Sequence, residues 1–171
     1  MPDIAELYET HFRYVWRCLR SLGVRDALLD DALQDVFIVA QRRLPEFDGA
    51  VAPGTWLYAI ALRIARKYRV RQRNDPSLDE LTQPELVAPG ADGEANLQRA
   101  QRLQLARAAL ETLDDEKREV FVLARVEQMS APEIAGVVGV PLNTVYSRLR
   151  AARLAFEAEV RRLEAAWRKA P

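Results

Sequence analysis

The sequence predicts an all-α protein of two small helical domains joined by an acidic flexible linker, the second domain containing a helix-turn-helix. Apolar residues make up 49% of the 171 residues, and only seven residues are glycine. The apolar residues recur at three- and four-residue steps, and no run alternates over the length of a strand. We expect the domains at residues 1–73 and 97–171, with the linker at residues 74–96.

Three helices are expected in the first domain. One spans residues 4–22 and ends at Gly23, and a second spans about residues 25–44 and stops before Pro45. Residues 46–54 hold two glycines and a proline, which predicts a loop. Thr55 is expected to cap the third helix, which runs over residues 55–74.

The second of these helices has an apolar side and an acidic side. Its expected core residues are Leu29, Leu33, Val36, Phe37 and Ala40. Its other faces carry Asp30, Asp31, Gln34, Asp35 and Gln41. Such an acidic run is usually a solvated surface, and it is equally suited to docking a basic partner.

The third helix becomes strongly basic toward its end. Six basic residues fall within eleven positions with no acid between them, namely Arg63, Arg66, Lys67, Arg69, Arg71 and Arg73. Basic residues near a helix C-terminus interact favourably with the helix dipole. Six of them exceed what that interaction requires, so the cluster favours contact with a polyanion.

The stretch between the domains differs sharply in charge from both. Residues 74–98 carry six acidic and no basic residues, whereas residues 1–73 carry 12 basic and 9 acidic residues and residues 99–171 carry 13 and 10. Three prolines and two glycines in this stretch favour a linker. Its length allows a span of up to roughly 70 Å when extended, so the two domains could reach distant sites on a large partner.

The second domain is expected to hold four helices. They cover residues 97–113, a segment starting at about Asp114, and a helix-turn-helix over residues 130–156. Ser130 and Glu133 have capping-box spacing, and Gly139 ends the first helix of that pair. The expected inward residues are Leu103, Ala106, Leu110, Leu113, Val145, Leu149, Ala152 and Phe156. An amphipathic tail with Leu163 and Trp167 follows.

The outward side of the last of these helices carries no acid. It is expected to present Asn143, Ser147, Arg150 and Ala151, with Thr144, Tyr146, Arg148 and Arg153 on its flanks. Short hydrogen-bonding groups and arginines suit a DNA groove, from which carboxylates would be repelled. A helical hairpin with a solvated basic face is the alternative.

The sequence does not predict enzymatic or metal chemistry. Cys18 is expected to be a core thiol in a reducing compartment, and the lone His11 has no ligand-spaced neighbour. No catalytic residue, metal or cofactor is predicted. No signal-peptide pattern or 18-residue apolar run occurs, so we expect no membrane insertion and a cytoplasmic location.

Two sets of motifs occur in order along the chain. The first domain holds Asp31, Gln34, Asp35, Val36 and Phe37, followed by Thr-Trp-Leu-Tyr at residues 55–58. The second holds residues 118–121, Ser130, and residues 133–135, 139–141, 144–145 and 147–149. With these motifs the chain resembles the extracytoplasmic-function sigma factors, the promoter-specificity subunits of bacterial RNA polymerase. It departs from the usual residues at Gln41, Ala59, Arg63, Tyr146 and Ala151.

The resemblance implies a non-enzymatic factor that binds core RNA polymerase and directs promoter-specific transcription initiation. The docking surface on the clamp helices of the largest subunit would comprise Asp31, Gln34, Asp35 and Phe37. The flap of the second-largest subunit would be a further contact, and the acidic linker would lie near the RNA exit path. Many relatives are held by an anti-sigma factor, which is therefore a candidate partner.

The resemblance also assigns promoter DNA to both domains. The minus-ten element would be bound by Phe47, Asp48, Thr55, Trp56, Arg63, Arg66, Lys67 and Arg69. The minus-thirty-five element would be bound by Asn143, Thr144, Tyr146, Ser147, Arg148, Arg150 and Arg153. An autonomous helix-turn-helix regulator is the main alternative, and it would normally dimerise on a pseudo-palindromic site. An adaptor that binds only protein is a further alternative.

Overall fold

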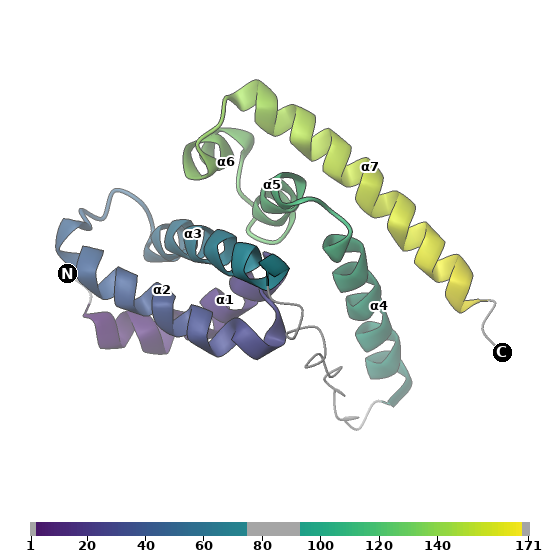
Figure 1. Cartoon of the computed structure of the whole chain (residues 1–171), viewed down its shortest axis with the longest axis horizontal. Helices are drawn as coiled ribbons and strands as arrows, with labels where there is room; N and C mark the ends of the chain where they lie inside the picture. Colours follow the sequence, from purple (N-terminus) through teal and green to yellow (C-terminus); the bar gives the residue numbers. More distant parts are fainter. Residues whose placement is uncertain (1–2, 75–92, 169–171) are drawn as a thin grey trace. The chain divides into compact units, whose positions relative to one another are not determined.

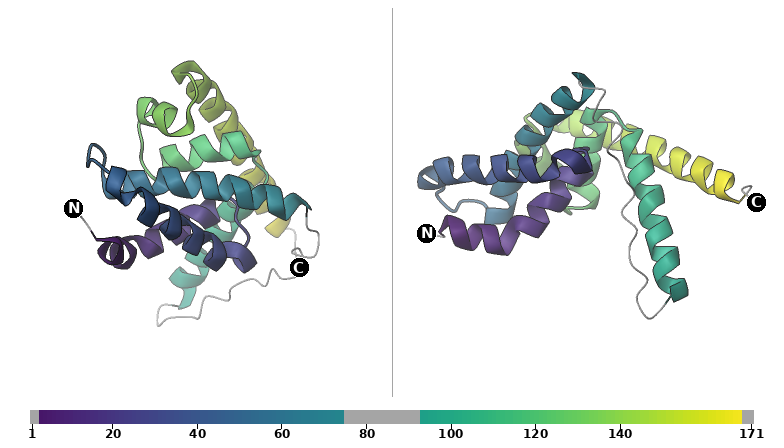
Figure 2. Two further views of the ribbon diagram at one scale, coloured as in Figure 1. Left: turned by 60° about the vertical axis from the view of Figure 1, so that its left-hand side comes forward. Right: turned by 60° about the horizontal axis from the view of Figure 1, so that its bottom comes forward.

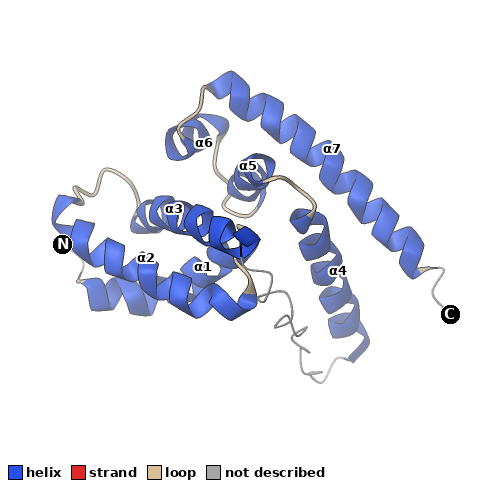
Figure 3. Cartoon of the chain, viewed as in Figure 1, coloured by secondary structure: helices blue, strands red, loops and turns tan. Residues whose placement is uncertain are grey.

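The computed structural model describes residues 3–74 and 93–168, and every regular element in these two stretches is a helix (Figure 3). The predicted all-α class is therefore confirmed. The described residues form two compact units, one holding α1 to α3 and the other holding α4 to α7. The predicted linker falls mostly on residues 75–92, which lie outside the described residues. Its two ends were wrongly assigned, because residue 74 is the last of one helix and residues 93–96 are the first of the next.

The first unit is a bundle of three helices (Figure 1). Helix α1 spans Ile4–Ser21, α2 spans Leu29–Arg43, and α3 spans Pro53–Asn74. Each helix packs against the other two. The packing removes from water an apolar core that includes Val15, Leu19, Leu29, Val36, Leu57 and Ala61. Cys18 is buried in α1, as predicted.

Two helices in this unit differ from their predicted bounds. The segment expected as one helix over about residues 25–44 begins with a 3-10 turn, Asp26–Leu28 (η1), and a second 3-10 turn, Leu44–Glu46 (η2), follows the end of α2. Thr55 does not cap α3, because the helix begins two residues earlier at Pro53. Proline suits a first helical turn, since its φ is already fixed and its nitrogen has no hydrogen to leave unpaired.

Two buried polar side chains of α3 anchor the connection between α1 and α2. Arg69 donates from Nη1 to the carbonyl oxygen of Leu22 at 2.6 Å. Gln72 donates from Nε2 to the Gly23 carbonyl at 3.0 Å and accepts from the Arg25 backbone N–H at 2.9 Å. Leaving a buried polar group without such a partner costs about 1–3 kcal/mol. These contacts fix the C-terminal half of α3 against the turn at Gly23.

The second unit is arranged along one long helix. Helix α4 spans Gly93–Glu111, α5 spans Asp115–Arg125, α6 spans Ala131–Val138, and α7 spans Leu142–Trp167. The three shorter helices each pack against α7, and α5 also packs against α6. Figure 2 shows that α7 is continuous to its C-terminal end, so the predicted amphipathic tail is the last part of this helix.

The core of this unit lies between α4, α5 and α7. It includes Leu113, Phe121 and Ala152, and the ring of Phe156 lies 4.8 Å from that of Phe121. Leu103 was expected to face this core, but the prediction was wrong, because 51% of its area is exposed. Helix α4 packs mainly against one helix, α7. One neighbouring helix covers only part of the apolar side of α4, so Leu103 stays exposed.

The buried Arg118 joins α4 to α5. Its Nε donates to the Leu110 carbonyl at 2.9 Å, and its Nη2 donates to the carbonyls of Glu111 and Leu113 at 2.9 and 3.1 Å. The last carbonyls of a helix have no partner within the helix, so this guanidinium satisfies the C-terminal end of α4.

The predicted helix-turn-helix is present as α6 and α7. The Ser130 backbone N–H and hydroxyl both donate to the Glu133 carboxylate, at 2.8 and 2.6 Å. Both hydrogen bonds lower the pKa of Glu133, and the one from the hydroxyl has the larger effect. Gly139 ends α6 in the left-handed region, with φ of +77°. Helix α7 then begins at Leu142 and buries Val145 and Ala152, two members of the predicted inward stripe.

Candidate nucleic-acid interface

The outward face of α2 combines polar side chains with one exposed apolar side chain. Asp31 and Gln34 are exposed, as the docking hypothesis requires. Phe37 is not available there, because only 7% of it is exposed and its ring packs edge-on against Tyr8 at 4.8 Å. Ile38, which is 37% exposed, points away from the core instead. Phe37 was therefore the wrong apolar residue for direct docking contact, and it supports α2 from within.

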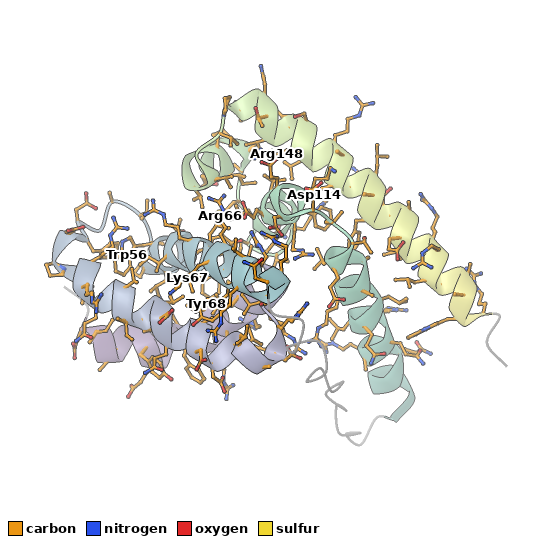
Figure 4. All side chains as sticks on the ribbon, viewed as in Figure 1. Trp56, Arg66, Lys67, Tyr68, Asp114 and Arg148 are labelled. Carbon is orange, nitrogen blue, oxygen red and sulfur yellow. The ribbon has the colours of Figure 1, made fainter. Side chains whose placement is uncertain are left out.

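Asp35 connects α2 to α3 rather than standing free on the docking face. Its Oδ2 accepts hydrogen bonds from Lys67 Nζ and from the Tyr68 hydroxyl, both at 3.2 Å. The pKa of Tyr68 is raised to about 12, mainly by burial and secondly by the nearby negative charge of Asp35. Figure 4 shows Lys67 and Tyr68 in succession on α3. Asp35 thus has a structural role that the docking hypothesis did not include.

The loop before α3 brings two aromatic rings together. The rings of Phe47 and Trp56 lie 4.9 Å apart, and both side chains are partly exposed. Asp48 is exposed, and its Oδ1 accepts from the Ala50 backbone N–H at 2.9 Å, which stabilises the turn. Thr55 lies inside the first turn of α3 and is half-buried. Partly exposed aromatic rings beside a basic helix suit the stacking of unpaired bases.

Helix α3 presents a basic strip to solvent. Arg63, Arg66 and Lys67 are exposed, as predicted for a polyanion contact. Arg69 was also assigned to DNA, and this assignment is corrected, because only 3% of it is exposed and it binds the Leu22 carbonyl. The helix period explains the difference, since Arg69 lies on the same side as the buried Ala65 and Gln72.

The first half of α7 exposes most of the predicted recognition residues. These are Asn143, Tyr146, Ser147, Arg150 and Arg153, while Thr144 is half-buried. The Ser147 hydroxyl donates to the Thr144 carbonyl at 2.9 Å, and Arg153 pairs with Glu157 at 2.8 Å. The N-terminal half of this helix is therefore available along its outward face.

Arg148 differs from these residues because it is tied to α5. Its Nη2 lies 2.6 Å from Glu116 Oε2, and its side chain is only 19% exposed. Asp114 caps α5 beside it, and its pKa is lowered chiefly by a hydrogen bond from the Lys117 side chain. Figure 4 labels Arg148 on α7 and Asp114 at the start of α5. Arg148 thus holds α7 against α5, a role that its predicted contact with the minus-thirty-five element did not include.

Two exposed apolar residues were missed by the sequence interpretation. Ile38 lies seven residues after Asp31 and four after Gln34, so all three share one face of α2 at about 100° per residue. Leu154 is 59% exposed and lies four residues after Arg150 on α7. The helical period places both side chains on the side of the helix opposite the buried residues, so their exposure could have been predicted from the sequence.

A shallow depression lies on the outward surface of α7. It is lined by Tyr146, Ser147, Arg150, Ala151 and Leu154. Three of these side chains are largely apolar, and the single charge is positive. No helix within the described parts of the chain is long and apolar enough to cross a membrane.

Comparison with known proteins identifies both units. Residues 7–75 match the family model of sigma-70 region 2, and residues 103–156 match that of sigma-70 region 4. The RNA polymerase sigma factor CnrH of Cupriavidus metallidurans is 34% identical over 160 residues, which cover 90% of this chain and 84% of that protein. The ECF RNA polymerase sigma-E factor of Escherichia coli is 35% identical over 141 residues, covering 78% and 74%.

Solved structures show the same similarity. The structure of CnrH in complex with the cytosolic domain of CnrY aligns with a TM-score of 0.63 at 26% identity, covering 91% of this chain and 85% of that one. The sigma factor RpoE in complex with the anti-sigma factor NepR from Bartonella quintana aligns with a TM-score of 0.71 at 20% identity, covering 94% and 98%. The latter alignment supports the fold alone.

Proposed function

Because this chain belongs to the extracytoplasmic-function group of sigma-70 family sigma factors, it directs promoter-specific initiation by RNA polymerase, and we propose how its exposed faces divide that work. Residues 1–73 dock on the polymerase and bind the minus-ten element. Residues 97–171 bind the minus-thirty-five element and contact the flap of the second-largest subunit. Residues 75–92 link the two near the RNA exit path. The factor acts in the cytoplasm, where polymerase and promoter are found, and it performs no chemistry of its own.

Two helices, one in each unit, expose arginines along stretches of sequence that contain no acidic residue. This observation is the main support for binding to promoter DNA. Helix α3 contains no aspartate or glutamate, and neither do residues 142–156 of α7. Acid-free basic helices are suited to phosphate-lined nucleic acid, where each neutralised phosphate releases a counterion. Two such faces in one chain suit a factor that contacts a promoter at two separated elements.

The surface of this chain that docks on the clamp helices of the polymerase is the solvent face of α2, which comprises Asp31, Gln34 and Ile38. Its centre is apolar and its rim is polar, as in protein interfaces whose central residue supplies most of the binding energy. Asp35 lies at the edge of this surface, between α2 and the basic strip of α3. Polymerase and promoter would therefore meet the first unit on adjoining faces.

The minus-ten contact is made by the loop before α3 and the strip that follows it. Phe47 and Trp56 provide rings on which unpaired bases can stack, and Arg63, Arg66 and Lys67 provide positive charge along the strand. Unstacking a base costs a few kcal/mol. Stacking and phosphate contacts offset that cost, so the aromatic pair and the basic strip are expected to act together.

A solved complex of a relative motivates an anti-sigma factor as a further partner, because CnrH was solved with the cytosolic domain of CnrY. We propose that a protein of this class holds this chain inactive. Such a protein would cover surfaces that polymerase otherwise binds, so the two are expected to compete.

Neutralising Arg63 is expected to reduce the salt dependence of promoter binding. Removing one phosphate-binding arginine lowers the slope of log affinity against log salt by about one. The measurement is equilibrium binding of the assembled holoenzyme to a promoter fragment at several salt concentrations. Arg17→Gln, an exposed arginine of α1, is the matched control for Arg63→Gln. Equal slopes for the two variants would rule out a phosphate contact at Arg63.

A further inference from the structure

Tyr146 and Leu154 are the two most exposed large apolar side chains of α7, and both line the depression on its outward face. Tyr146 is 55% exposed and Leu154 is 59% exposed. Each lies four residues from Arg150, one before it and one after it, so the three follow a single line along the helix. Exposed apolar groups of this size are unfavourable in water, and their placement around a recognition arginine suggests an apolar contact on DNA.

The chemistry of the depression between these side chains limits what can enter it. Tyr146, Ala151 and Leu154 provide apolar walls, and Arg150 provides the only charge among the lining residues. The Ser147 hydroxyl already donates its hydrogen to the Thr144 carbonyl at 2.9 Å. The depression therefore combines apolar surface with a cationic fork that donates hydrogen bonds.

Among base edges in the major groove, two fit this combination. Thymine carries a C5 methyl group, the one apolar feature of the groove, and guanine presents O6 and N7 to a bidentate arginine. Four residues of helix rise about 6 Å, whereas successive base pairs along one strand are about 3.4 Å apart. The tyrosine ring and the guanidinium would thus reach pairs that lie within about two steps of each other.

We propose that Tyr146 is a specificity-determining residue that contacts the C5 methyl of a thymine within two base pairs of a guanine bound by Arg150. This inference rests on the proposed function of α7 at the minus-thirty-five element. It adds the identity of a base and the chemical group that is recognised.

The first test selects sequences from a promoter library randomised in the minus-thirty-five region, using holoenzyme assembled from core polymerase and the full chain. The wild type is expected to enrich a thymine within two base pairs of a guanine. Tyr146→Ala should lose the thymine preference and keep the guanine, whereas Tyr146→Phe should keep both, because the ring and not the hydroxyl makes the contact. Val126→Ala, which removes an exposed apolar side chain outside the depression, is the control and should match the wild type.

The second test replaces the selected thymine by deoxyuridine, which removes only the methyl group. Wild-type holoenzyme should bind the uridine promoter on the order of three- to fivefold more weakly, as expected for one buried methyl group. Tyr146→Ala should bind both promoters equally. Equal binding by the wild type, or a thymine preference that survives in Tyr146→Ala, would overturn the inference while leaving minus-thirty-five recognition intact. A library that yields no enriched sequence would overturn both.

Discussion

Replacing Asp31 with arginine is expected to abolish co-purification of the protein with core RNA polymerase. Asp31 is exposed in the first turn of α2, on the same face as Gln34 and Ile38. A reversed charge inside an interface places like charges together and costs several kcal/mol. The fold itself should survive, since an exposed acid near a helix N-terminus contributes only about 0.3–1 kcal/mol through the helix dipole.

The control for this experiment is Glu6→Arg. Glu6 is an exposed acid in the first turn of α1, so the substitution makes the same change of charge and the same loss near a helix N-terminus. Co-purification is measured by pulling tagged variants from a mixture with purified core enzyme, with circular dichroism to check folding. Equal recovery of core enzyme with Asp31→Arg and Glu6→Arg would remove α2 from the docking surface.

Asp35 is a poor choice for this test even though it belongs to the same motif. Its carboxylate binds Lys67 and Tyr68 on α3. An arginine there would place two positive charges together and would remove the partner of the Tyr68 hydroxyl. Loss of polymerase binding by Asp35→Arg could then follow from a disturbed first unit, whereas Asp31→Arg leaves those contacts in place.

Arg150→Ala is expected to cost about 1–3 kcal/mol of discrimination between the cognate promoter and one with an altered minus-thirty-five element. Arg150 is exposed at the centre of the outward face of α7 and lines its depression. A guanidinium that contacts a base edge contributes to one sequence more than to others. Competition binding of holoenzyme to the two promoters measures the ratio of affinities.

The same measurement at two salt concentrations separates base contact from phosphate contact. A phosphate contact at Arg150 would weaken both promoters alike and reduce the salt slope by about one. Arg162→Ala is the control, because Arg162 is an exposed arginine of the same helix that lies outside the residues assigned to DNA and is paired with Glu159. An unchanged affinity ratio in Arg150→Ala would contradict direct recognition of a base by this residue.

The helical elements could be predicted from sequence because their apolar period is regular and their ends carry strong local signals. Ser130, Glu133 and Gly139 determine both ends of α6 through contacts within a few residues. The predicted start of α3 was wrong because Pro53 and Thr55 both suit the beginning of a helix. Which of them begins it depends on the path of the preceding loop.

The errors at the candidate site arose where the motif and the helix period disagree. The docking motif includes Phe37, whereas the period of α2 buries that residue and exposes Ile38. Arg69 was assigned to DNA because it belongs to the basic cluster, although the helical period of α3 places its side chain inward. In both cases the period was the better guide, because it reflects which side of the helix packs.

Other features could not be predicted, because they join residues that are distant in the sequence. Asp35 and Lys67 are separated by 32 positions, and Arg148 pairs with Glu116 across two helices. Their pairing depends on how α2 meets α3 and how α5 meets α7. No local pattern contains this information, so these anchoring roles emerge only from the packed structure.

Run-off transcription with purified core polymerase tests the central claim most directly. The templates are genomic fragments that include the promoter of the protein's own operon. Discrete transcripts are expected only when this chain and core polymerase are both present, with start sites at a fixed distance from a shared pair of elements. A stable dimer that binds a palindromic site without polymerase, together with no promoter-specific transcript, would contradict the account.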